Sequence, residues 1–149
     1  MISFSLEGLP PSVNKAYVPG PYGRSKLSAE ARKYKEDTLL YITQTYIREL
    51  SSLHYTPNTE WVAIYVFELS LYTAKNTIKK IDVSNRIKLL EDVVVNATGI
   101  DDSATITVVS SKVHNPTATK THVHFARHAD PEIENVLRKV IARTYPHGR

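Results

Sequence analysis

Residues 61–71 of this chain read Trp-Val-Ala-Ile-Tyr-Val-Phe-Glu-Leu-Ser-Leu, and this stretch decides the fold. The positions from Trp61 to Phe67 are all apolar, so an extended chain there would bury side chains on both of its faces. A strand buried on both faces lies in the interior of a sheet and has other elements packed against it. The sequence therefore predicts a central strand that begins at Trp61 and ends near Tyr72.

Three further strands are expected on either side of this one. Ile2, Phe4 and Leu6 alternate with polar residues, which predicts a short half-buried strand at the N-terminus. Two β-rich runs follow later, over 105–114 and 121–127, with an Asn-Pro turn between them. The segments that read as loops or turns are 10–26, 54–58 and 73–80.

Helix signals mark three segments. Ser28 is a suitable N-cap for a helix to about Leu50, and Gly99 is a suitable stop for a helix over 82–98. Asp130 followed by Pro131 predicts a helix that runs to about Thr144. The order strand, helix, strand, helix, strand, strand, helix predicts the α/β (α+β) class. We expect one domain over 1–149, with a mixed β-sheet packed with helices.

Composition restricts the classes of function. Nineteen Lys and Arg against fifteen Asp and Glu leave a net charge of +4, which suits a nucleic-acid partner without proving one. The chain has no cysteine, which excludes disulfides, thiolate zinc sites and cysteine nucleophiles. The N-terminus lacks the features of a signal peptide, and no stretch approaches a membrane span. We expect an intracellular, cytoplasmic protein with no membrane association.

The chemistry is concentrated in residues 79–92, Lys-Lys-Ile-Asp-Val-Ser-Asn-Arg-Ile-Lys-Leu-Leu-Glu-Asp, and in Asp101-Asp102 further on. On a helical wheel the apolar residues of 83–97 gather in one arc of about 120°. A polar face lies opposite, formed by Ser84, Asn85, Lys88, Asp92 and Asn96. Most such faces are only solvated. Taken singly, Asp82 reads as a helix cap, Asp101-Asp102 as a turn, and Lys88 as an i,i+4 partner of Asp92.

Together these residues resemble the acidic core of the RusA family of Holliday-junction resolvases. The pattern is Asp82-x-x-Asn85-x-x-Lys88, then Asp92, then Asp101-Asp102. The N-terminal segment is similar too, and the resemblance covers about residues 5–106. Its motifs are Leu9-Pro10-Pro11-Ser12-x-Asn14-Lys15 with Tyr17, then Gly23-Arg24, Ser28-Ala29-Glu30 and Tyr34.

The resemblance implies a homodimer that binds four-way DNA junctions and makes paired, symmetric nicks with Mg²⁺. It implies metal ligation by Asp82 and Asp102 and a catalytic cation at Lys88. We expect Asp101, also as a metal ligand, and Asp92 to assist. The chain departs from the family at Ser84, where the best-known members have a second aspartate. Ser84 could hold a metal-bound water, or Asp92 or Asp101 could take over the missing role.

DNA contacts are expected from cations and polar groups outside the acidic core. The candidates are Asn14, Lys15, Tyr17, Arg24, Lys79, Lys80 and Asn85. His122 and His124 alternate on one predicted strand, where a polar strand face is more plausible than a zinc site. No nucleotide fingerprint or serine-hydrolase motif is present, so no organic cofactor is expected. Two rival functions stay open: a junction-binding protein that has lost catalysis, and a magnesium nuclease of looser specificity for branched DNA.

Overall fold

A computed structural model describes residues 1–53 and 56–144 of the chain. The chain divides into two compact units whose segments interleave in the sequence. The first, here called the sheet unit, consists of Met1–Leu9, Thr56–Ile81 and Ser103–Arg149. The second, here called the helical unit, consists of Pro10–Tyr55 and Asp82–Asp102. Each unit is described by itself.

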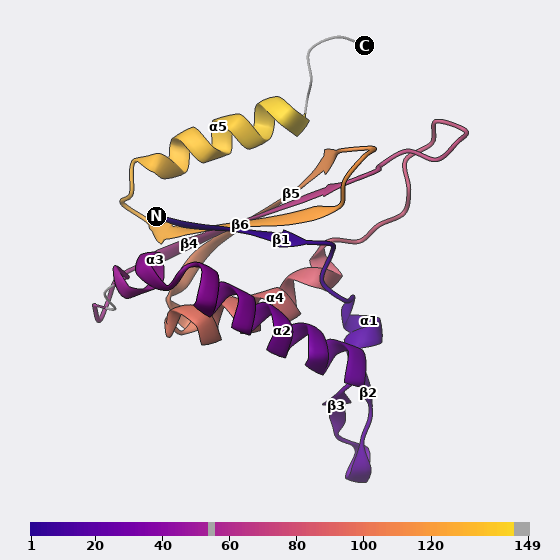
Figure 1. Cartoon of the computed structure of the whole chain (residues 1–149), viewed down its shortest axis with the longest axis horizontal. Helices are drawn as coiled ribbons and strands as arrows, with labels where there is room; N and C mark the ends of the chain where they lie inside the picture. Colours follow the sequence, from indigo (N-terminus) through magenta and orange to yellow (C-terminus); the bar gives the residue numbers. More distant parts are fainter. Residues whose placement is uncertain (54–55, 145–149) are drawn as a thin grey trace. The chain divides into compact units, whose positions relative to one another are not determined.

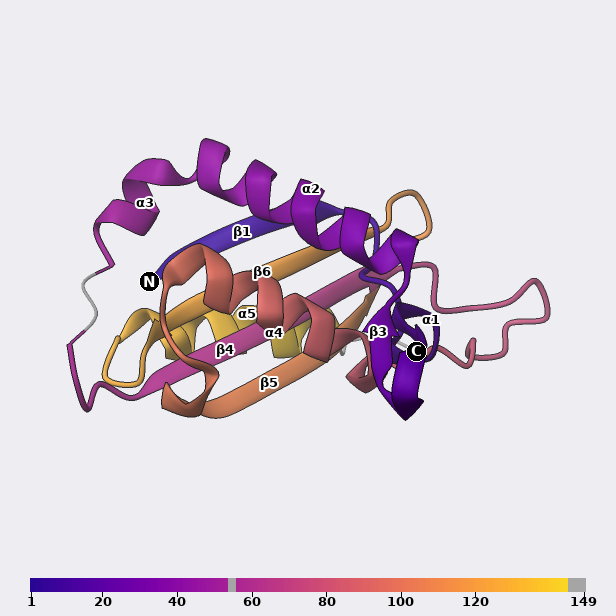
Figure 2. The same cartoon turned by 90° about the horizontal axis from the view of Figure 1, so that it is seen from below.

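The sheet unit is built on a four-stranded mixed sheet in the order β1-β6-β4-β5 (Figure 2). Strand β6 pairs antiparallel with β1 and with β4, whereas β4 and β5 run parallel. The strand bounds are β1 Ile2–Glu7, β4 Trp61–Leu69, β5 Thr105–His114 and β6 Lys120–Arg127. The strands at 2–6, 105–114 and 121–127 were each predicted, and the structure confirms them.

Strand β4 is the central strand that its sequence predicts. All nine of its residues are buried, and β5 and β6 flank it. On one face Val62, Ile64 and Val66 form a core with Val136 and Val140 of helix α5, Glu132–Thr144 (Figure 1). On β4 and β6, the rings of Trp61 and Phe125 stack at 4.9 Å between centroids. Because the side chains of a strand alternate between its faces, both faces of β4 must be covered.

Three helices of the helical unit, α1, α2 and α4, contribute residues to a small core. Ala16, Ala31 and Leu89 are fully buried there, and the half-buried rings of Tyr17 and Tyr34 pack against them. Ser28 caps helix α2 by accepting a hydrogen bond of 3.2 Å from the Ala31 N–H. The helices are α1 Val13–Ala16, α2 Ala29–Thr45, α3 Ile47–Ser51 and α4 Ser84–Thr98.

Helix α4 ends where the sequence predicts. Gly99 adopts a left-handed conformation with φ of 68°, and its N–H bonds to the Val95 carbonyl. This is the usual way in which a glycine terminates a helix. At the other end Arg86, the one charge near the apolar arc, donates from its guanidinium to the Pro10 carbonyl. That bond gives a half-buried cation a partner and ties α4 to the segment before α1.

The structure confirms the α+β class and the mixed sheet; a single domain over 1–149 stays a prediction. Two local predictions were wrong. Residues 10–26 are not a plain loop, since they contain α1 and a small hairpin of β2, Tyr17–Pro19, with β3, Ser25–Leu27. The helix expected over 28–50 is broken at Tyr46 into α2 and α3. Of the turn predicted at 54–58, residues 54 and 55 lie outside the described part of the chain.

Candidate functional site

Asp82 lies just before helix α4, exposed, with both carboxylate oxygens in hydrogen bonds. Oδ1 accepts from the Ser84 N–H at 3.0 Å and from the Ser84 hydroxyl at 2.6 Å. Oδ2 accepts from the side-chain amide of Asn85 at 2.7 Å. The carboxylate therefore caps the first turn of α4, where an anion is also favoured by the helix dipole. The first two polar residues of the predicted face, Ser84 and Asn85, are turned back toward Asp82.

A second acidic group surrounds Lys88 in the body of α4. Burial raises the pKa of the half-buried Glu91, and the carboxylates of Asp102 and Asp92 raise it further. The Lys88 ammonium acts in the opposite direction on the same pKa. These four side chains therefore share one electrostatic environment. Groups with shifted pKa values cluster at functional sites, which makes this part of α4 a candidate site.

The partner of Asp92 is Lys35 of helix α2, with 3.4 Å between Nζ and Oδ2. Lys88 is exposed and forms no ion pair with any residue that the structure describes. One interpretation of Lys88 from the sequence was an i,i+4 ion pair with Asp92. The structure pairs Asp92 with Lys35 instead.

The structure does not bring all the predicted metal ligands together within one chain. Asp82 precedes α4 and Asp101-Asp102 follow it, and a helix of fifteen residues is about 22 Å long. Within residues 1–53 and 56–144, no three His, Asp or Glu side chains are grouped closely enough to hold a metal ion. The donors are all carboxylates, which is the chemistry that Mg²⁺ prefers.

The predicted DNA-contacting residues divide between the two units. Asn14, Lys15 and Arg24 are exposed in the helical unit, whereas the ring of Tyr17 packs against its core. Lys79 and Lys80 belong to the sheet unit, where Lys79 donates to the Ser70 hydroxyl at 3.2 Å. Lys80 is exposed. Asn85 is engaged with Asp82, as described above.

Sequence reasoning missed Glu91 and a buried polar cluster around Glu68. The signal for Glu91 was its position three residues after Lys88, on the same side of α4. The signal for Glu68 was a carboxylate inside a run of buried apolar residues, where a charge needs partners. The partners of Glu68 lie far away in the sequence, so no local pattern can identify them.

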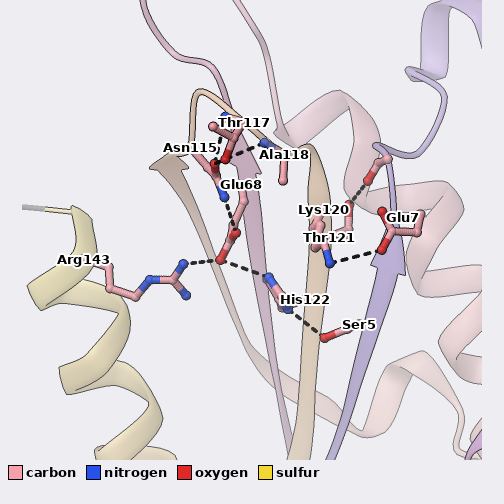
Figure 3. Close-up of polar contacts among 11 residues, drawn as sticks. Ser5, Glu7, Glu68, Asn115, Thr117, Ala118, Lys120, Thr121, His122 and Arg143 are labelled. Carbon is pink, nitrogen blue, oxygen red and sulfur yellow. Dashed lines mark hydrogen bonds and ion pairs between the residues drawn. The ribbon is translucent and has the colours of Figure 1, made fainter.

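Glu68 lies at the end of β4 and is only 6% exposed. It is paired with Arg143 of α5 and accepts a hydrogen bond of 3.1 Å from Asn115 (Figure 3). His122 of β6 brings Nε2 to 3.0 Å from the carboxylate, and its Nδ1 bonds to the Ser5 hydroxyl at 2.9 Å. Burial alone would raise the pKa of Glu68, but Asn115, Arg143 and His122 outweigh it and hold the pKa below its ordinary value. We assign this cluster to stability, because it joins β4, β6 and α5.

His122 and His124 lie on a polar face of β6, which is the interpretation that the sequence favoured. Their Nδ1 atoms bond to Ser5 and Ser3 of the neighbouring strand β1, at 2.9 and 2.8 Å. Burial lowers the pKa of His124, and His122 beside it lowers the pKa further. Both residues line a groove of 590 Å³ beside α5, together with Val136 and Lys139.

Comparison of the chain with protein-family models and with curated proteins gives no match. In the part of the chain that the structure describes, none of the helices has the length and apolar character needed to cross a membrane.

Proposed function

We propose that this protein is a Mg²⁺-dependent, structure-specific DNA endonuclease that resolves four-way junctions by paired, symmetric nicks. The observation that carries the proposal is that the exposed Lys88, with Asp92 and Asp102, acts electrostatically on the half-buried Glu91, on the helix that Asp82 caps. Four of these five residues, all but Glu91, belong to the pattern that resembles RusA-type resolvases. The proposal places the protein inside a bacterial cell, encoded by the cell or by a phage, in DNA recombination and repair.

Each side chain has a role in phosphodiester hydrolysis. Lys88 would contact a non-bridging phosphate oxygen and stabilise the negative charge that grows in the transition state. Asp82, Asp101 and Asp102 would hold Mg²⁺, which supplies charge neutralisation and a more acidic water. Glu91, whose pKa is raised, is suited to accept a proton from an attacking water molecule. Asp92, held by Lys35, would keep the negative field of the site in place.

A homodimer accounts for the separation of Asp82 from Asp101-Asp102 along α4. A two-fold axis relates the acidic groups of the two copies, so a group of one copy can lie beside a different group of the other. Asp82 of one copy would then meet Asp101 and Asp102 of the second copy, and this would occur twice. Two equivalent sites suit a four-way junction, whose opposing strands are also related by symmetry.

One observation favours a second candidate function, a junction-binding protein without catalysis. Ser84 stands where the resemblance expects a carboxylate, and its hydroxyl already occupies Oδ1 of Asp82. With one carboxylate fewer and another engaged, metal binding would be weak. A nuclease of looser specificity, acting on flaps or forks, differs from the first proposal only in its substrate.

The test is a nicking assay on a synthetic mobile four-way junction, with linear duplex and a flap substrate beside it. Reactions contain Mg²⁺ or EDTA, and the variant Asp82→Asn is compared with Asp37→Asn, an exposed aspartate of α2. We expect paired nicks in Mg²⁺ that fall at least about 100-fold in Asp82→Asn and are unchanged in Asp37→Asn. If the protein binds the junction but does not nick it in any metal, the second candidate, a junction-binding protein without catalysis, is supported. Equal cleavage of flaps and junctions would leave the looser nuclease.

A further inference from the structure

Strand β5 is an edge strand with one open side. It pairs with β4 along one edge, and no other strand of the described chain pairs with its outer edge (Figure 2). The strand runs for ten residues, Thr105–His114, which is long for an edge. Within the sheet unit, its outer backbone N–H and C=O groups therefore have no strand partner among the described residues.

The composition of β5 does not protect this edge. Folded proteins usually blunt an open edge with charged side chains, proline or a bulge that turns it away. Residues 105–111 of β5 contain no charge and no proline. Ile106 and Val108 are exposed by 51% and 44%. Since side chains alternate along a strand, these two share one face, opposite to Val109 and Val113, which pack in the core beneath α5.

The two ends of β5 carry opposite charges. Asp101 and Asp102 stand just before its start, whereas Lys112 lies near its end and donates to the Ile81 carbonyl at 3.2 Å. An antiparallel partner of the same sequence would reverse this order. It would lay the acidic start of one strand against the basic end of the other and bring two pairs of exposed apolar side chains onto one face.

We propose that the outer edge of β5 is the surface on which a second copy of this chain docks, by antiparallel β5–β5 pairing about a two-fold axis. Such a contact closes on itself, so it yields a dimer and no fibre. The two four-stranded sheets become one continuous sheet across the pair. That the protein is a dimer belongs to the proposed function; this inference adds the surface.

The first experiment uses the absence of cysteine from the chain. Single cysteines are introduced at Thr107, Val108, Val109 and Ser110, with Ile141→Cys as the control, because Ile141 is exposed on α5. A residue on or next to a two-fold axis faces its own copy, within the distance that a disulfide spans. Under mild oxidation we expect one or two β5 positions to form disulfide-linked dimers at least about tenfold faster than the control.

The second experiment measures the dimer directly, without DNA or Mg²⁺. Ile106→Lys combined with Val108→Lys places like charges along the edge, and Ile141→Lys is the matched control. Sedimentation equilibrium should show that the double variant dissociates at roughly tenfold or higher concentration, with the control unchanged. The circular dichroism of both variants shows whether they fold, and the cysteine scan remains decisive if the double variant does not.

Two results would overturn the interface: a wild-type chain that stays monomeric at high concentration, or a dimer that cross-links no faster through β5 than through Ile141→Cys. These outcomes are separate from the nuclease assay. A monomer that nicks junctions would remove the interface alone, whereas a β5-linked dimer that nicks nothing would remove the proposed activity alone.

Discussion

The hydroxyl of Ser84 donates a hydrogen bond of 2.6 Å to Oδ1 of Asp82. The Ser84 N–H donates to the same oxygen at 3.0 Å, so Oδ1 accepts two hydrogen bonds from one residue. The hydroxyl is the part of this contact that a substitution can remove while the helix cap is kept. Asp82 therefore serves the start of α4 in this chain, and any cation it binds must compete with Ser84.

Replacing Ser84 by Asp should strengthen Mg²⁺ binding. The change removes the competing hydroxyl and adds a second carboxylate beside the first, which a divalent cation neutralises. We expect the Mg²⁺ concentration for half-maximal junction nicking to fall by about tenfold. Gln44→Glu, at an exposed position of α2, adds the same charge elsewhere. It should leave the Mg²⁺ concentration for half-maximal nicking unchanged. An unaltered Mg²⁺ dependence in Ser84→Asp would show that Asp82 does not bind the metal.

Stability should fall in acid through Glu68. Since the pKa of Glu68 is lower in the folded protein, its contribution is present above the unfolded pKa and is lost as pH falls through the folded one. Urea denaturation should therefore show a declining free energy of unfolding from about pH 5 downward, with a shallower decline in Glu68→Gln. Asp130, whose pKa is lowered by the N-terminal ammonium, contributes in the same direction in both proteins. Identical pH profiles for wild type and Glu68→Gln would contradict the assignment.

Stability should also fall in alkali through Tyr34. Burial raises the pKa of Tyr34 from 10.0 to about 12, which outweighs the lowering influence of Thr38 nearby. The unfolded chain therefore releases this proton first, and the free energy of unfolding should drop by about 2 kcal/mol between about pH 10 and pH 12. Tyr34→Phe should lack this drop. Tyr22→Phe, at a fully exposed ring, should retain it.

Gly99→Ala tests the end of α4 by itself. The left-handed φ of 68° disfavours a side chain, while an added Cβ would meet nothing within 4 Å. The cost is therefore one of backbone conformation, about 1 kcal/mol of unfolding free energy in urea denaturation. Gly99→Asn should cost less, because Asn tolerates the left-handed region better. Equal losses for the two variants would show that something other than φ is responsible.

Signals that lie within a few residues were sufficient to predict most elements of this fold. The apolar run from Trp61 marks the central strand, Ser28 caps α2, and Gly99 ends α4. Each depends on alternation, a cap or a backbone angle, all of which are local. The hairpin of β2 and β3 escaped prediction because three-residue strands are too short to show a period.

The same sequence determined which residues could form a site: carboxylates, a lysine and an asparagine placed around one helix. Only the tertiary structure decided their partners. It paired Asp92 with Lys35 and enclosed Glu68 with Arg143 and His122. Such pairings join residues far apart in the chain, and they follow from strand order and helix packing. No local pattern encodes these distances, since they arise when the whole chain buries its apolar surface.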